Sequence, residues 1–356
     1  MKNKIAIASA FLAASSFSAA EIVINDVLSF EGFVDMSYSH TDIDEPAGDT
    51  DPDNAQASNS NSWAVDQVEI SWLFDFEPVT AQIDLQYEGE SFRTETFDGN
   101  VSEGNNDLDQ VIVEQAFATY SMADGAAITA GRYASMLGFE AFEPTGLYQY
   151  STAYTFFDNN KIETPGYAQG VKYTKESENT FFGFSVQDSI SDEYDDNFGG
   201  PDGGWGVEGA GAYTLENGLS IFAGFAFEDS DEDGSAYVLN GYVTYETGAW
   251  IFAAELNFGE TDSDTVGEDV DGVAGLLMAN YAYSDKASIT GRVSFYDQDD
   301  EAEAGEEEGV AFTLAHGYAF TDNLFVVTEV SVAEESAATG ADTETLFGAV
   351  ELLFTF

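Results

Sequence analysis

The chain has 356 residues and no cysteine, and its residues are 44% hydrophobic and 14% aromatic. This composition, with 34 Gly and only 6 Pro, is typical of a β-rich protein, and it excludes a disulfide framework. The formal charge is −58, from 9 basic and 67 acidic residues, which excludes counterion-driven binding to nucleic acid. Acidity of this degree favours a surface that stays hydrated in salty surroundings.

The first twenty residues have the organisation of a secretory signal. Two lysines precede a short apolar segment from Ile5 to Phe17, and Ser18-Ala19-Ala20 supplies the small residues that a signal peptidase recognises. We therefore expect cleavage of residues 1–20 and one exported domain over residues 21–356. No apolar run approaches the ~20 residues of a membrane-spanning helix. A mature chain embedded in a membrane would therefore have to be a barrel.

Alternating segments follow the signal in chain order. The first, residues 28–39, gathers apolar side chains on one face, and the polar run 40–62 after it predicts a long solvated loop. Residues 63–76 and 79–88 alternate in the same way and are joined by a minimal turn at Glu77-Pro78. A period of two is the pattern of strands with one apolar and one polar face.

The connections between these segments alternate between long and short. Tight turns are predicted at Glu77-Pro78, Asp124-Gly125, Glu178-Asn179, Asn217-Gly218, Thr247-Gly248, Asp285-Lys286 and Asp322-Asn323. Long or acidic connections follow segments that end near Ser39, Glu88, Tyr133, Asp188, Glu228, Gly259, Asp297 and Val332. Eight long connections and seven turns separate sixteen strands, and 356 − 20 = 336 residues give 336/16 = 21 per strand and connection.

That spacing suits a transmembrane antiparallel β-barrel with long outer loops, short turns and both termini on the short-turn side. One alternating strand alone would fit a sheet of a soluble sandwich better. The alternation of long and short connections, however, continues to the end of the chain, which favours the barrel. The last segment alternates through Leu352 and ends on Phe354 and Phe356. Such an ending resembles the recognition signal of outer-membrane barrel assembly. We therefore expect a bacterial outer-membrane location, with lipid, lipopolysaccharide and the barrel-assembly machinery as partners.

Several short motifs add a family resemblance. They are Ala130-Gly131-Arg132-Tyr133, Gly138-Phe139-Glu140, Glu143-Pro144-Thr145-Gly146 and the aromatic run through Tyr154, Phe156 and Phe157. With the whole-chain architecture, they make the protein similar to bacterial general porins, and more narrowly to the OmpL-like family of β-barrel porins. The resemblance implies a passive diffusion channel for small hydrophilic solutes and ions, a homotrimer, and no cofactor.

One long connection differs from the others. Residues 134–162 form the third long loop, and they are rich in aromatic residues that would be costly to leave in water. In trimeric porins the third long loop narrows the channel, so the resemblance implies that this loop folds into the lumen as a constriction. The alternative is that it packs outside, as a latch against a neighbouring subunit or as an extracellular cap.

Charged residues near this loop suggest how it would act. Strand parity points Lys172 and Arg292 inward, and we expect Arg132 inward too, because an Arg facing lipid costs about 2–4 kcal/mol. Our hypothesis is a transverse field between these three bases on the wall and Glu140 and Glu143 on the loop. Simple hydration of a wet barrel interior is the alternative reading. Inward acids on the first three strands outnumber the bases, which predicts a preference for cations: Glu31, Asp35, Glu69, Asp75, Asp84 and Glu88.

Two rival functions remain open. The first is a structural or adhesive barrel without an open pore, in which acidic outer loops could bind divalent cations that bridge to lipopolysaccharide. The second is a barrel enzyme such as a phospholipase, which would need an activated serine beside His40 or His316, and neither has a recognisable serine motif. We predict no catalytic residue. We also predict no metal site, because the calcium-loop-like run Asp229–Gly234 has Asn240 where a bidentate Glu is needed.

Overall fold

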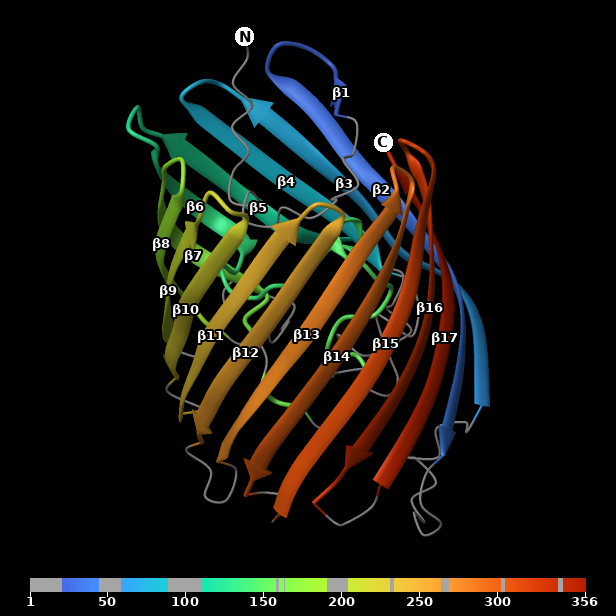
Figure 1. Cartoon of the computed structure of the whole chain (residues 1–356). Helices are drawn as coiled ribbons and strands as arrows, with labels where there is room; N and C mark the ends of the chain where they lie inside the picture. The colour runs from blue at the N-terminus through green and yellow to red at the C-terminus, as the bar shows by residue number, and fades with distance from the viewer. Residues whose placement is uncertain are drawn as a thin grey trace.

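A computed structural model shows the chain as a single antiparallel β-barrel (Figure 1). The structure describes residues 21–44, 59–88, 111–157, 160–162, 164–190, 204–230, 234–263, 269–301, 305–338 and 342–356. The predicted signal, residues 1–20, lies outside the described residues. Within the described part of the chain, no helix is long and apolar enough to span a membrane.

Sixteen long strands follow a two-residue strand, β1 (Ile22–Val23), that pairs with the first of them. Their bounds are β2 (Leu28–Asp44), β3 (Asn59–Asp75), β4 (Val79–Glu88), β5 (Val111–Ser121), β6 (Ala126–Ala134), β7 (Tyr167–Glu176), β8 (Thr180–Gln187), β9 (Trp205–Thr214), β10 (Leu219–Ser230), β11 (Gly234–Thr247), β12 (Trp250–Asp262), β13 (Val270–Ser284), β14 (Ala287–Asp300), β15 (Gly305–Thr321), β16 (Leu324–Ser336) and β17 (Asp342–Thr355). Each strand pairs antiparallel with the next, and β17 pairs with β2, which closes the ring. The predicted sixteen-stranded barrel is confirmed.

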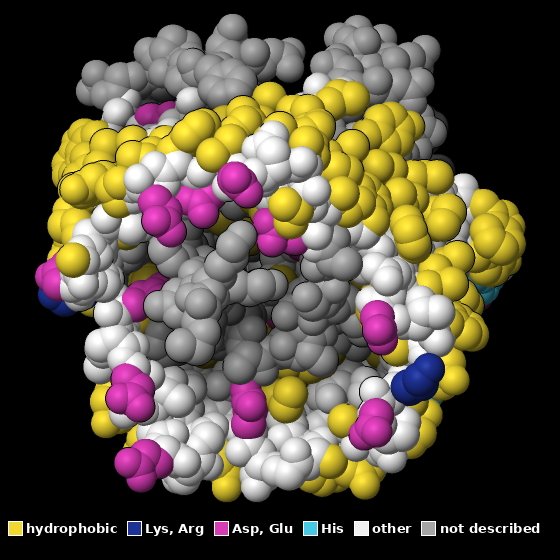
Figure 2. Space-filling view, turned by 90° about the horizontal axis from the view of Figure 1, so that it is seen from above, with side chains coloured by type: hydrophobic (Ala, Val, Ile, Leu, Met, Phe, Trp, Pro, Cys, Tyr) yellow, Lys and Arg dark blue, Asp and Glu magenta, His cyan; other side chains and the backbone are white. Residues whose placement is uncertain are grey.

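The alternating residues divide cleanly between the two faces of the wall, because successive side chains of a strand point in opposite directions. On β8 the apolar Phe182, Phe184 and Val186 are 54%, 40% and 52% exposed on the outside, whereas Ser185 and Gln187, which point the other way, are buried. Figure 2 shows the outer wall as a largely hydrophobic surface and acidic side chains around the open end of the barrel. The predicted lipid-facing rows are therefore correct.

The end of the chain lies in the closing seam of the barrel. The backbone of Phe356 exchanges two hydrogen bonds with Gly32 on β2, each with an N···O distance of 2.9 Å. A side chain at Gly32 would collide with the Glu69 carbonyl and the Phe356 ring, so only glycine fits this seam. Phe354 faces outward beside it. The role of these two phenylalanines as an assembly signal stays a prediction.

Some strands are longer than the sequence indicated. The predicted loop 40–62 is wrong at both ends, since β2 continues through His40 to Asp44 and β3 begins at Asn59. Likewise β10 continues to Ser230 and β11 begins at Gly234, which pairs with Ser230, so the strands extend into both ends of the acidic run. Polar composition suggested loops here, but antiparallel strands accept polar side chains wherever a face meets water.

Two β-bulges change the parity on the β2–β5 side of the ring. The pairing of β2 with β3 skips Asp66, and the pairing of β4 with β5 skips Glu114. A bulge re-aims the side chain of its extra residue. Both carboxylates are buried, and Asp66 accepts a hydrogen bond from inward-facing Ser37. Simple alternation therefore missed two acids of the barrel interior.

Candidate functional site

The described residues of the connection between β6 and β7 are 135–157, 160–162 and 164–166, and they are called the inner loop from here on. The inner loop lies inside the barrel. Its described residues make hydrogen bonds to inward side chains on strands around the ring: Glu208 on β9, Asn240 on β11, Glu255 on β12, Arg292 on β14 and Glu329 on β16. The loop thus crosses the lumen. The predicted inward fold is confirmed, and packing on the outside of the barrel is excluded.

Three buried wall glutamates hold the backbone of the inner loop. Glu208 accepts the N–H of Met136 at 3.0 Å, and Glu255 accepts the N–H of Phe139 at 2.7 Å. Glu329 accepts the backbone N–H groups of residues 150 and 151 at 2.8 and 3.0 Å, together with the residue 151 hydroxyl at 2.6 Å. Hydrogen bonds to a carboxylate are stronger than neutral ones. These anchors were not predicted, although inward parity on β9, β12 and β16 was a signal for them.

Arg292 fastens the same loop from β14. Its Nη1 donates to Glu140 Oε1 and to the Ser151 carbonyl, both at 2.8 Å. Its Nη2 donates to the Thr152 carbonyl at 2.7 Å and to the Ser151 hydroxyl at 3.0 Å. The guanidinium points inward and faces Glu140, as expected, but the side chain is fully buried. Arg292 therefore positions the loop and does not itself meet water in the lumen.

Lys172 and Arg132 lie near the ends of the loop. Lys172 points inward and is buried, with Nζ donating to the Ala134 carbonyl at 3.1 Å and lying 4.2 Å from the centre of the Tyr133 ring. Its contacts are thus with the start of the loop, whereas Glu140 pairs with Arg292. Arg132 Nε donates to the Glu114 carbonyl at 2.9 Å, and its guanidinium lies 5.6 Å from the centre of the Tyr167 ring.

Aromatic side chains of the inner loop pack against inward rings of the wall. Tyr150 stacks on Phe347 with the ring centres 5.8 Å apart, and Phe157 lies 5.1 Å from Tyr296. Inward glycines leave room for this packing. At Gly309 on β15, an added Cβ would lie 2.8 Å from the Phe157 ring and 2.6 Å from the Tyr296 ring. Real side chains cannot approach so closely, so the wall is shaped to accept the loop.

We expect Gly309→Leu to destabilise the barrel, because the new side chain must displace the rings of Phe157 and Tyr296. Overpacking of this kind costs about 1–3 kcal/mol. The free energy of unfolding in detergent, from urea titration, measures the effect. Gly291→Leu on β14 is the control, since an added Cβ there meets no atom within 4 Å. Equal stability of the two variants would contradict the prediction.

Three of the six predicted wall acids point inward and are covered. Asp35 and Asp84 are fully buried, and Glu69 is also buried. The Asp84 carboxylate accepts hydrogen bonds from Gln82 and Gln115 at 2.9 and 2.8 Å, within the wall itself. Glu31 is partly exposed and Asp75 is exposed at the turn, whereas the side chain of Glu88 lies outside the described residues. The expectation that all of these acids line open water is therefore wrong for the buried ones.

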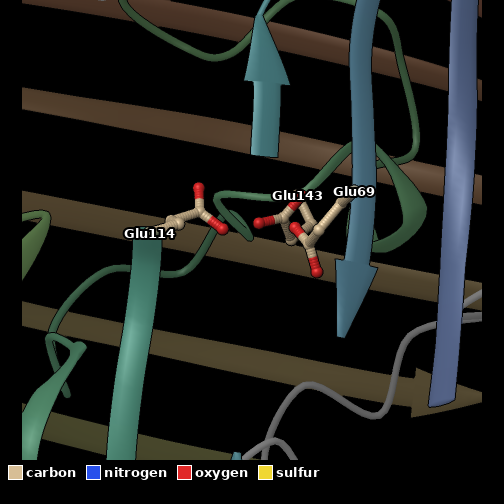
Figure 3. A group of neighbouring side chains, drawn as sticks. All are labelled: Glu69, Glu114 and Glu143. Carbon is tan, nitrogen blue, oxygen red and sulfur yellow. The ribbon is translucent and has the colours of Figure 1, made fainter. Parts of the chain in front are cut away.

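Glu143 lies on the opposite side of the lumen from Arg292, against β3 and β5. It accepts a hydrogen bond from Gln67 at 3.0 Å and one from the Tyr167 hydroxyl at 3.4 Å. Figure 3 shows its carboxylate beside those of Glu69 and Glu114. Desolvation and these two neighbouring carboxylates raise the pKa of Glu143 well above its ordinary value.

The two histidines have partners other than serine. His40 Nδ1 lies 3.1 Å from Asn61 Oδ1, and His316 Nε2 lies 2.7 Å from the Tyr283 hydroxyl. A serine hydrolase requires a serine hydroxyl within hydrogen-bond distance of the histidine that acts as its base, and neither contact involves a serine. The described residues around the histidines therefore offer no support for the enzyme alternative.

Solved structures of similar fold are outer-membrane proteins. The outer membrane channel DcaP of Acinetobacter baumannii has a TM-score of 0.66 and 11% identity over 92% of this chain and 97% of that chain. OmpT of Vibrio cholerae has a TM-score of 0.63 and 10% identity over 94% of this chain and 100% of that chain. An anion-selective porin from Comamonas acidovorans has a TM-score of 0.62 and 13% identity over 92% of this chain and 99% of that chain. At such identities the likeness shows the fold alone. No curated protein sequence matches the chain.

A closed sixteen-stranded antiparallel barrel is the fold that the chain shares with these outer-membrane proteins. The chain belongs to the family described as putative beta-barrel porin-2, OmpL-like, whose model matches residues 27–356. Family and fold together define an outer-membrane channel protein.

Proposed function

We propose that the protein is a passive diffusion channel for small hydrophilic solutes and ions, and that it prefers cations. The observation that carries the proposal is the inner loop, which is fastened across the lumen of a closed barrel by Arg292 and three wall glutamates. A loop in this position reduces the open cross-section, so permeation depends on the size and charge of the solute.

The cation preference rests on the distribution of charge inside the described barrel. The inward bases Lys172 and Arg292 are buried beneath the inner loop, where they face glutamates and carbonyl groups instead of solute. Acids that point inward are buried as well, but in the described barrel they outnumber the inward bases: Asp66, Glu114, Glu208, Glu255, Glu329 and Glu351. The field of this interior therefore favours cations.

The reversal potential of single channels in a potassium chloride gradient tests this preference. We expect a sign that corresponds to a higher permeability for potassium than for chloride, and a smaller selectivity at high salt because mobile ions screen the fixed charges. A clear preference for chloride would overturn the cation preference but not the channel. The Comamonas porin is described as anion-selective, so the fold itself does not decide the sign.

The open pore itself needs a separate test, because a structural or adhesive barrel would have the same fold. Swelling of proteoliposomes in sugars of graded size should show rates that fall as the sugar becomes larger. A barrel that is plugged would give no flux that depends on sugar size. This outcome would favour the structural or adhesive alternative.

In this proposal the assembled protein is a homotrimer in the outer membrane. Residues 1–20 direct its export and are then cleaved. Support for the trimer comes from one structural neighbour described as the trimer form of Vibrio cholerae OmpT, with a TM-score of 0.57 and 12% identity over 92% of this chain and 99% of that chain. Subunit mass in mild detergent and N-terminal sequencing of the exported protein test the two points. Lipopolysaccharide and the barrel-assembly machinery are its expected partners.

A further inference from the structure

Three glutamates from separate segments meet on the β3–β5 side of the lumen (Figure 3). Glu69 lies on β3, Glu114 is the bulge residue of β5, and Glu143 is at the start of the short 3₁₀ turn of the inner loop. One carboxylate oxygen from each lies within 4.8 Å of the others. Two oxygens that both bind a calcium ion at about 2.4 Å can lie at most about 4.8 Å apart. The spacing therefore suits a shared cation.

Two of these carboxylates have oxygen atoms with no hydrogen-bond partner in the described structure. These atoms are Glu69 Oε2 and Glu114 Oε2. The two residues are only 6% and 4% exposed. A buried charged oxygen without a partner is costly. Figure 3 shows the Glu114 side chain directed toward Glu143. These two oxygens therefore suit a positively charged ligand at the place where the three residues converge.

The charge around the cluster is consistent with a divalent ion. With a cation bound in place of their protons, the three carboxylates carry −3, and the neighbouring Arg132, which donates to the Glu114 carbonyl, offsets one of these charges. Gln67 donates a hydrogen bond to Glu143 from its side-chain amide, which is neutral and does not change this charge. Carboxylate oxygens are the ligands that Ca²⁺ and Mg²⁺ prefer, and Ca²⁺ tolerates the irregular geometry of groups drawn from different segments.

We propose that Glu69, Glu114 and Glu143 form a divalent-cation site, best suited to Ca²⁺, that joins the inner loop to the barrel wall. The site lies across the lumen from the Arg292 anchor, so the loop is held at both sides. It depends on the β5 bulge, because only the bulge turns Glu114 inward. Nothing in the proposal requires that the barrel conducts.

Terbium luminescence in detergent tests the site, using Tb³⁺ as the probe that replaces Ca²⁺. The Tyr167 hydroxyl lies 3.4 Å from Glu143 Oε1, so excitation of tyrosine should sensitise an ion bound there. Because the whole chain is strongly acidic, weak surface binding must be screened with potassium chloride at physiological ionic strength. We expect one saturable class of sites, competed by Ca²⁺ with an affinity of about 10⁻⁵ to 10⁻³ M.

Glu114→Gln and Glu143→Gln should each weaken this class at least tenfold. Glu335→Gln is the matched control, because Glu335 is a buried inward glutamate that accepts the Tyr296 hydroxyl, and a glutamine can still accept it. Heat-dependent mobility on gels checks that each barrel is folded. If wild type and all three variants bind Tb³⁺ alike, or if only weak unsaturable binding occurs, the site does not exist and the carboxyl groups share protons instead.

Calcium should also stabilise the folded wild-type protein, because an ion that binds only the folded state shifts the unfolding equilibrium. We expect the unfolding midpoint to rise with CaCl₂ and fall with EDTA, and this dependence to be lost in Glu114→Gln but kept in Glu335→Gln. A dependence that is equal in both variants would assign the effect to the acidic surface and overturn the proposal. Channel failure in the conductance experiments would leave this measurement unaffected.

Discussion

Replacing Arg292 with alanine is expected to free the middle of the inner loop and to raise the single-channel conductance. The side chain is fully buried and its two terminal nitrogens hold Glu140 and the backbone carbonyls of Ser151 and Thr152. Removing one partner of a buried ion pair costs about 3–5 kcal/mol, because the remaining carboxylate stays desolvated. We expect that cost to be relieved by movement of Glu140 into water.

Planar-bilayer recordings measure the conductance, and limited proteolysis measures how readily the loop is cleaved. Arg292→Lys should restore only part of the wild-type behaviour, since an ammonium cannot reproduce the planar fork of the guanidinium. Lys286→Ala is the control, because Lys286 is exposed at the turn before β14 and its Nζ donates only to the Phe320 carbonyl at 3.2 Å. An unchanged conductance in a folded Arg292→Ala barrel would show that the loop position does not limit flow.

Deletion of Phe139 to Gly146 is the second change from which we expect a large effect. The deleted segment contains the Phe139 backbone N–H that Glu255 accepts, and both Glu140 and Glu143. The remaining chain could not reach β14 and β3 together, so the lumen should widen. We expect a higher conductance and passage of larger sugars in the swelling assay.

The outcome of this deletion separates the two roles that the loop could have. If the loop narrows the pore, the conductance and the size limit both increase while the number of subunits in the assembly stays unchanged. If the loop lies in the lumen without limiting flow, neither the conductance nor the size limit changes. The second result would contradict the proposed constriction.

The barrel could be predicted from the sequence because its rules are local. Lipid-facing residues such as Phe182, Phe184 and Val186 follow a strict period of two, and the alternation of long and short connections gives the strand number. The inward direction of Lys172 and Arg292 follows from the same parity. Strand ends were less predictable, because polar residues at Asp42 or Asn59 fit both a loop and a water-exposed strand.

The details of the site depend on long-range geometry that one sequence does not contain. Asp66 and Glu114 enter the interior only because of bulges, which shift the parity by one residue without a local signal. Glu208, Glu255 and Glu329 could be placed on the inner face by parity. Their role as anchors depends on the path of the loop across the lumen, which is set by contacts between residues more than 70 positions apart.

The anchors Glu208, Glu255 and Glu329 bind mainly the main chain of the inner loop, through the N–H groups of Met136, Phe139 and Ser151. Every residue except proline has such a group. Many of the loop's side chains can therefore be exchanged without changing how the wall holds it. The protein thus separates the path of its loop from the chemistry that the loop presents, so that new solute preferences can evolve by substitution on a backbone that stays in place.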